Sequence, residues 1–464
     1  MLCFSALGVR TCGRRARADG NCNELRSGIV KSLERRTIGK VTRRLLPLLM
    51  VSYFIAYLDR VNVAFAGPGM MRDLSFTYTV FGTGAGIFFI GYVLFEVPSN
   101  LVFVKLGARK WIARIMLTWG LISAATAFVW DDNSFYVIRV LLGIAEAGFF
   151  PGVIYYFALW YPAEHRARVI SWFMFAIPVS IIIGAPISGF ILGMGNVAGV
   201  AAWRWLFVLE AAPAVIMAFV VWRCLSDRPA DAQWLAADER QWLAARLSTE
   251  SHGRYPPHYR AALRALLDRR VLLLGLVYAS ILVPNYGIAF FLPQIIIQFG
   301  GLSSVEVGLI NAIPYLAGAV AMVLWARHSD ATRERKWHIA LPAGLMAAGF
   351  IAAALVDTLD LKIVAISLAA LGFSISPVFW TVPASILRGA SAAAGIAAIN
   401  SIGNLGGYFG PQIFGIIKDT TGTDSGGLLF LAGSGLFAFV LVLMLGRNRA
   451  LEEGISRTYS GDRP

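Results

Sequence analysis

Long apolar segments alternate with short polar segments along most of this chain. The apolar segments are about 20 residues long or longer, which is the length at which an α-helix crosses the hydrocarbon core of a bilayer. The pattern predicts six spans, a polar segment, and six further spans. The predicted spans are residues 45–66, 80–104, 109–130, 134–160, 168–195, 204–223, 271–293, 304–326, 338–356, 361–387, 391–417 and 426–446.

The polar segments divide the chain into two equal halves. The first segment is Arg-rich and has no apolar run long enough for a signal peptide. Its part before about Val30 lacks helical periodicity, so we expect it to be partly disordered. The central segment carries many charges and a Pro-Pro pair, which is typical of a linker with some helix. The predicted parts are a tail (1–44), a six-helix half (45–223), a linker (224–268), a second six-helix half (269–446) and a short tail (447–464).

Basic residues gather in alternate polar segments. The positive-inside rule places such segments in the cytoplasm. Both termini and the linker are therefore predicted on the cytoplasmic side of a bacterial-type inner (plasma) membrane. The residues that carry this prediction are Lys105, Arg109, Lys110, Arg166, Arg168, Arg327, Arg333, Arg335, Lys336, Arg447 and Arg449, together with those of the linker.

Composition supports a membrane protein and excludes several other classes. The chain is 57% hydrophobic and only 15% charged, which leaves too little polar surface for a water-soluble domain. The net charge of +14 does not indicate a nucleic-acid partner, because the basic residues are spread over alternate loops. The four cysteines have neither paired nor metal-ligand spacing, and no metal or cofactor is predicted.

Four of the ionisable residues inside predicted spans stand out, because each costs several kcal/mol at bilayer depth unless it has a partner or a function. Asp59 and Arg60 lie in the first span, and Arg139 and Glu146 lie in the fourth. Seven residues separate Arg139 from Glu146, so they share one helix face. Two internal salt bridges that hold the helices together would explain them. Ion or proton movement through a cavity explains better why four charges stand at one depth.

Arg60 is the candidate for binding an organic anion, because its planar guanidinium matches a carboxylate. Glu146 is the candidate proton carrier, since desolvation of a carboxylate favours its neutral form. A substrate carboxylate that competes for Arg60 would favour protonation of the acid beside it. Tyr53 and Tyr57 lie on the face of Arg60, with aromatic packing as an equal alternative, and Tyr92 lies in the second span. We interpret Glu96, one turn after Tyr92, as a structural hydrogen-bonding or gating group and not as a substrate ligand.

The second half of the chain has no clear charge at mid-membrane depth. It offers neutral polar side chains instead, which we expect to select the substrate, with interhelical hydrogen bonding as an equal alternative. Its glycine-rich stretch 403–407, like 82–86 in the first half, predicts close helix packing. The candidate substrate-binding residues here are Tyr278, Asn285, Trp380, Asn400 and Asn404, with Tyr286, Ser376 and Tyr408 nearby.

At these residues the sequence resembles the major facilitator superfamily and, within it, the anion:cation symporter family. The resemblance covers residues 40–446. It rests on YLDRVN (57–62), FEVPSN (95–100), RVLLGIAEAGFFPG (139–152), WRWLF (203–207) ahead of Glu210, and NSIGNLGGYFGP (400–411). The turn 105–114 departs from the superfamily's loop motif, because it lacks the usual acidic residue.

The resemblance implies an all-α membrane fold of twelve helices in two pseudo-symmetric halves. It also implies a proton gradient as the driving force and small carboxylated substrates. Carried over by motif, Arg60 would bind the substrate carboxylate and Glu146 would be protonated during transport. Asp59 and Arg139 would form a pair that breaks during gating. Tyr57, Tyr92 and Asn400 would line the site.

The predicted function is therefore proton-coupled import of a small organic anion by alternating access, carried out by a monomer. The substrate would be a hydroxy or sugar acid, a tartrate-like acid or an aromatic carboxylate. A proton-coupled exporter of drugs or metabolites is the alternative. Gly184-Ala185-Pro186 in the fifth span favours it weakly, because a related glycine-proline pattern occurs in exporters. An enzyme is disfavoured, because no loop places a nucleophile beside a histidine or carboxylate.

Overall fold

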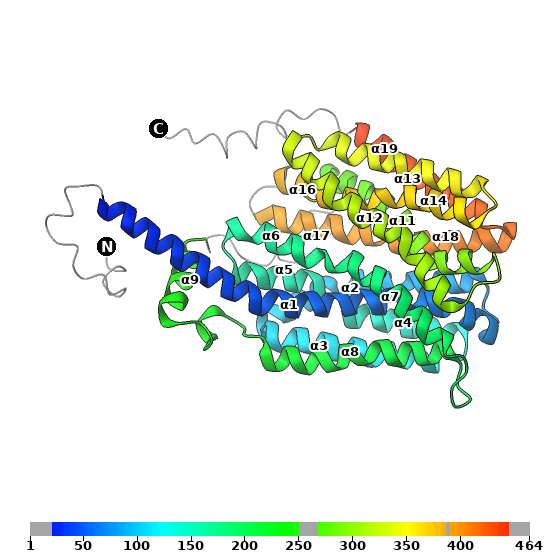
Figure 1. The fold of residues 1–464 in the computed structure, drawn as a ribbon, viewed down its shortest axis with the longest axis horizontal. Helices are drawn as coiled ribbons and strands as arrows, with labels where there is room; N and C mark the ends of the chain where they lie inside the picture. The colour runs from blue at the N-terminus through cyan, green and yellow to red at the C-terminus, as the bar shows by residue number, and fades with distance from the viewer. Residues whose placement is uncertain (1–20, 251–267, 387–389, 445–464) are drawn as a thin grey trace.

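The structure is a computed structural model and describes residues 21–250, 268–386 and 390–444. These residues form a bundle of helices in two groups, which lie one above the other in Figure 1. The first group contains α1 (Asn21–Leu74), α2 (Tyr78–Leu106), α3 (Ala108–Ala125), η2 (Thr126–Phe128), α4 (Asp132–Glu146), α5 (Phe149–Trp160), α6 (Ala163–Met174), α7 (Ala176–Gly193) and α8 (Ala202–Cys224).

The second group follows the linker helices η3 (Pro229–Asp231) and α9 (Ala237–Glu250). It contains α11 (Arg269–Ile297), α12 (Ser304–Thr332), α13 (Lys336–Leu355), α14 (Leu359–Ala370), η4 (Leu371–Ser374), α15 (Ile375–Phe379), α16 (Thr381–Ile386), α17 (Ala390–Asn404), α18 (Gly406–Thr421) and α19 (Asp424–Met444). We call the end of the bundle where α9 lies the linker end, and the opposite end the far end.

The predicted spans match the helices. In the described part of the chain, 11 helical segments are long and apolar enough to cross a membrane. Four of them combine several helices, namely α3 with η2, α4 with α5, α6 with α7, and α14 with η4, α15 and the start of α16. The remaining predicted span, 391–417, is occupied by α17 and α18, which follow one another across a break at Leu405. The chain therefore has the all-helical architecture of twelve spans that its hydropathy predicts.

The first helix is longer than predicted. Residues 21–29, expected to be irregular, belong to α1, which begins at Asn21. Its first turns are rich in helix-favouring Leu, Glu, Arg and Lys, and they continue a helix that the bundle already holds. The linker helix also secures α1, because the Glu239 carboxylate forms ion pairs with Arg36 Nε at 2.9 Å and with Lys40 Nζ at 2.8 Å.

The fourth span is broken where the candidate proton carrier lies. Helix α4 ends at Glu146, and Gly148 has φ of +87°, a conformation that favours glycine. A Cβ on Gly148 would also collide with the Ser99 side chain of α2. The break therefore places the Glu146 side chain at the end of α4, facing α1.

The two halves pack most closely at the far end of the bundle. Helix α2 lies against α18, and α7 lies against α12. Gly82 and Gly86 of α2 contact the backbone of Pro411 and Tyr408, and Gly308 of α12 contacts the carbonyl of Ala185. Glycines permit this approach of one backbone to another. The close packing predicted for stretch 82–86 is confirmed.

An interhelical cap reinforces the far end. The Asp419 carboxylate of α18 accepts hydrogen bonds from the backbone N–H groups of Tyr78 and Thr79, at 3.0 and 2.7 Å. These are free donors of the first turn of α2, where a negative charge is favourable. Lys418 pairs with Asp424 at 2.6 Å and lies 4.2 Å from the centre of the Tyr78 ring. The structure is therefore a conformation closed at the far end.

Candidate functional site

A buried ion pair lies near the middle of the bundle. Arg60 of α1 donates from Nη2 to Oε1 of Glu146 at the end of α4. The side chains are 8% and 4% exposed. Breaking a buried pair by removing one partner leaves an uncompensated charge, which costs several kcal/mol. The pair thus joins α1 to α4 and makes each charge depend on the other.

Aromatic side chains surround the Arg60 guanidinium. Its central carbon lies 4.9 Å from the ring centre of Tyr57, 5.2 Å from that of Phe88 and 5.6 Å from that of Tyr92. The ring faces stabilise the cation without neutralising it. Residues Tyr57 and Tyr92 thus lie beside Arg60, as the sequence predicts.

Arg60 also reaches the second half of the molecule. Its Nη1 lies 3.5 Å from the hydroxyl of Tyr286 on α11. The Nε atom is buried and has no hydrogen-bond partner among the described residues. A guanidinium at the boundary of the halves, with a donor left over, suits the binding of an anion between them.

No ion pair joins Asp59 to Arg139 in this conformation, and a pair that breaks during gating stays a prediction. Asp59 accepts from Trp119 Nε1 at 2.7 Å and from Ser123 Oγ at 3.1 Å. Arg139 donates to the carbonyl oxygens of Gly84 and Ala85, each at 3.2 Å. Consecutive residues of a helix point about 100° apart, so Asp59 faces α3 while Arg60 faces α4.

A further buried acid lies behind Asp59. Glu210 of α8 is 2% exposed and accepts from Ser188 Oγ at 2.6 Å. Its other oxygen has no hydrogen-bond partner among the described residues. The sequence interpretation treated Glu210 only as part of a motif. Its position inside the span 204–223 was the signal that could have singled it out.

Glu96 joins the two halves directly. This residue of α2 is 4% exposed and accepts from Asn400 Nδ2 at 2.9 Å and from Ser401 Oγ at 3.4 Å. Both donors belong to α17 of the second half. The contact agrees with the prediction of a hydrogen-bonding role for Glu96, and it places the candidate substrate ligand Asn400 against an acid.

The other candidates of the second half fall into two groups. Tyr278 stacks on Phe379 and meets Trp380 edge to face, with ring centres 5.0 Å apart in both pairs, and Gly403 packs against it. Asn404 is buried at the end of α17. Asn285 lines a small pocket inside the second half with Tyr315. Its neighbour Tyr286, which was only a secondary candidate, reaches Arg60 instead.

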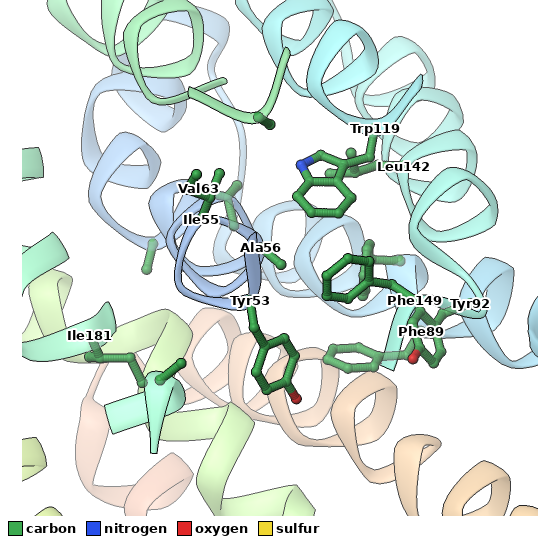
Figure 2. Packing of buried hydrophobic residues seen from close by; sticks show 14 of the residues in the cluster. Tyr53, Ile55, Ala56, Val63, Phe89, Tyr92, Trp119, Leu142, Phe149 and Ile181 are labelled. Carbon is green, nitrogen blue, oxygen red and sulfur yellow. The ribbon is translucent and has the colours of Figure 1, made fainter. Parts of the chain in front are cut away.

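Tyr53 belongs to the hydrophobic core. It stacks on Phe173 at 4.4 Å and on Phe149 at 6.1 Å between ring centres. Figure 2 shows Tyr53 and Phe149 in this core, with Trp119 and Tyr92 nearby. For Tyr53 the aromatic-packing alternative describes the structure.

One group of side chains in the described part of the chain has metal-ligand spacing. Glu34, Glu164 and His165 bring their ligand atoms within 4.8 Å of one another at the linker end. The group is partly exposed, and Arg246 pairs with Glu164 at 2.8 Å. The Arg246 guanidinium already pairs with the Glu164 carboxylate, so these side chains form an ion-pair cluster at the surface.

The fold and this site together define a class of protein, the secondary transporters of membranes. The Major Facilitator Superfamily model matches residues 49–411, and the chain belongs to that superfamily. A relative from Agrobacterium vitis, named "Putative tartrate transporter", is 50% identical over 90% of this chain and 93% of its own length. The chain is a multi-pass membrane protein of a transporter family, not of an enzyme family.

Two further similarities bear on function and fold. A "Quinolone resistance transporter" from Acinetobacter baumannii is 42% identical over 89% of this chain and 95% of its own length. The inward-open structure of the xylose transporter XylE from E. coli superposes with a TM-score of 0.68 over 89% of this chain and 99% of its own, at 15% identity. At that identity the likeness shows the fold alone.

Proposed function

We propose that this protein imports a small organic anion together with protons by alternating access. The observation that carries the proposal is the buried Arg60 guanidinium at the boundary of the halves, held by Glu146. The substrate class is a hydroxy acid, a sugar acid or an aromatic carboxylate. The name of the Agrobacterium vitis relative favours a tartrate-like acid within that class.

Charge balance at the ion pair provides the coupling. Arg60 and Glu146 together are neutral, and no other ion pair of either residue is found among the described side chains. A bound carboxylate adds one negative charge to a site with little water, and a proton on Glu146 restores neutrality. Protonation also weakens the hold of Glu146 on Arg60, which frees donors for the substrate. Anion and proton therefore each favour the binding of the other.

Alternating access follows from the contacts between the halves. Loading from the far end requires the cap by Asp419 and the glycine contacts between α2 and α18 to separate. We place the far end outside and the linker end, with both termini, in the cytoplasm of an inner membrane, because the basic loops lie at the linker end. The transport unit is proposed to be one chain.

A proton-coupled exporter of drugs is the second candidate. The Acinetobacter baumannii relative, whose name refers to quinolone resistance, favours it. The buried Arg60 argues against cationic cargo, because it would repel a positive charge. Resistance to lipophilic cations that survives Arg60→Ala and disappears in Glu146→Gln would support export and contradict the anion assignment.

The test is uptake into proteoliposomes. Labelled tartrate, sugar acids and aromatic acids are supplied outside, with and without an inward proton gradient. The proposal expects one acid to accumulate above its external concentration only when the gradient is present. Failure of every acid, together with proton-driven loss of a preloaded drug, would replace import by export.

A further inference from the structure

A second carboxylate of the first half occupies donors that a substrate anion would use. Asn400 Nδ2 and Ser401 Oγ, both on α17, point at the two oxygens of Glu96 at 2.9 and 3.4 Å. An amide N–H and a hydroxyl that converge on one carboxylate form an anion-binding arrangement. In this conformation the protein's own acid fills it.

The environment of Glu96 contains no compensating charge in the described part of the chain. The titratable groups that face it are phenols, Tyr92 one turn away on α2 and Tyr278 on α11. Asn400 and Ser401 face it from α17, and no described lysine or arginine pairs with it. A buried carboxylate that is held only by neutral donors gains from protonation when a second anion approaches.

The position of Glu96 relates it to the Arg60 site. Glu96 follows Tyr92 by four residues, which is about one turn and a rise of about 6 Å along α2. The Tyr92 ring centre is 5.6 Å from the Arg60 guanidinium carbon. Two sets of donors, Arg60 beside Tyr92 and the Asn400–Ser401 pair beside Glu96, therefore lie against neighbouring turns of α2. Each set is occupied by an acid of the first half, Glu146 on Arg60 and Glu96 on Asn400 and Ser401.

We propose that Glu96 is an internal substitute for the substrate anion and sets the affinity of the second-half donors for substrate. When Glu96 takes up one proton from water, Asn400 and Ser401 are released from it and donate to an oxygen of the substrate. This inference rests on the proposed anion transport and assigns a second acid to it. Glu96 then acts as a positioning residue, because it acts through Asn400 and Ser401.

The Glu96→Gln variant tests the inference, since its amide oxygen still accepts from Asn400 while the charge is gone. Binding of labelled L-tartrate, D-galactarate and benzoate is measured on the full chain in nanodiscs from pH 5.5 to 8. We expect the wild-type affinity for the acid that binds to fall as pH rises. The Gln variant should bind that acid about tenfold more tightly than wild type at pH 8, with a shallower pH dependence.

Two further variants separate charge from structure. Glu96→Asp keeps the charge and should retain the wild-type pH dependence. Asp360→Asn removes a charge from an exposed position on α14 and should change nothing. An unaltered affinity and pH profile in a folded Glu96→Gln protein would overturn the inference alone. If wild-type protein binds none of the three acids at any pH, the proposed function fails as well.

Discussion

The two halves of the molecule share an architecture but bury different chemistry. The first half buries Arg60, Arg139 and Glu146 near the middle of the bundle, with further acids around them. The described side chains of the second half at that depth are neutral, such as Tyr286 and Asn400, and its buried ion pair Lys418–Asp424 lies at the far end. Because apolar packing would join the helices at lower cost, the contrast supports the proposal that the first half moves charge and the second half adds neutral contacts to the cargo.

The largest effect should come from Glu146→Gln. The amide cannot take up or release the proton, so accumulation driven by a gradient should be abolished, while exchange between equal substrate concentrations continues. Uptake and counterflow in the same proteoliposomes measure the two activities. Loss of exchange as well would make Glu146 a structural or substrate-contact residue.

Arg60→Lys should have the next largest effect. Lysine keeps the charge but loses the planar fork and the stacking on Tyr57 and Tyr92, so substrate affinity should fall at least about tenfold. Equilibrium binding measures this change. Unchanged affinity would reject a bidentate grip on a carboxylate.

Substitutions in the second half should alter preference and leave coupling intact. Tyr286→Phe removes the hydroxyl near Arg60, and a single hydrogen bond of this kind corresponds to a change of about two- to tenfold in affinity. We expect the ranking of competing acids to shift while the protons moved per substrate stay constant. A changed proton ratio would show that the division between the halves is wrong.

The far-end cap should affect the balance of conformations. Asp419→Asn weakens the bonds to the α2 N-terminus, which a charged acceptor strengthens. The population open at the far end should rise a few-fold, as measured by distances between spin labels on the loops near Arg72 and Asp360. An unchanged distance distribution would remove Asp419 from the gate.

The smallest effect is expected at the linker. Burial opposes ionisation of Glu239, but hydrogen bonds from Lys40 and the Ala236 N–H, with the charges of Lys40 and Arg36, hold its pKa below the usual range. Because its pKa is lower in the folded state, ionised Glu239 stabilises the protein at pH values above its ordinary pKa of about 4.3. This contribution is lost as pH falls through the lowered pKa. Glu239→Gln should therefore lower the free energy of unfolding by less than about 1 kcal/mol at pH 7, and by less again at an acidic pH below the lowered pKa of Glu239. A large loss at both pH values would indicate a packing role.

The sequence predicted the spans and the buried charges well, because both follow from hydropathy and helix periodicity. It could not decide which of Asp59 and Arg60 faces Glu146, since that depends on how α1 is rotated against α3 and α4. The contact of Glu96 with Asn400 joins residues 304 positions apart and follows only from the packing of the halves. The first helix was predicted too short, because its early turns lack an apolar face.

Proton movement driven by substrate tests the division of labour most directly. Proteoliposomes that contain a pH-sensitive dye start with equal pH on both sides, and the transported acid is added outside. The account predicts acidification of the interior with wild-type protein and none with Glu146→Gln. Acidification at the wild-type rate in that variant, or proton movement opposite to the substrate, would contradict it.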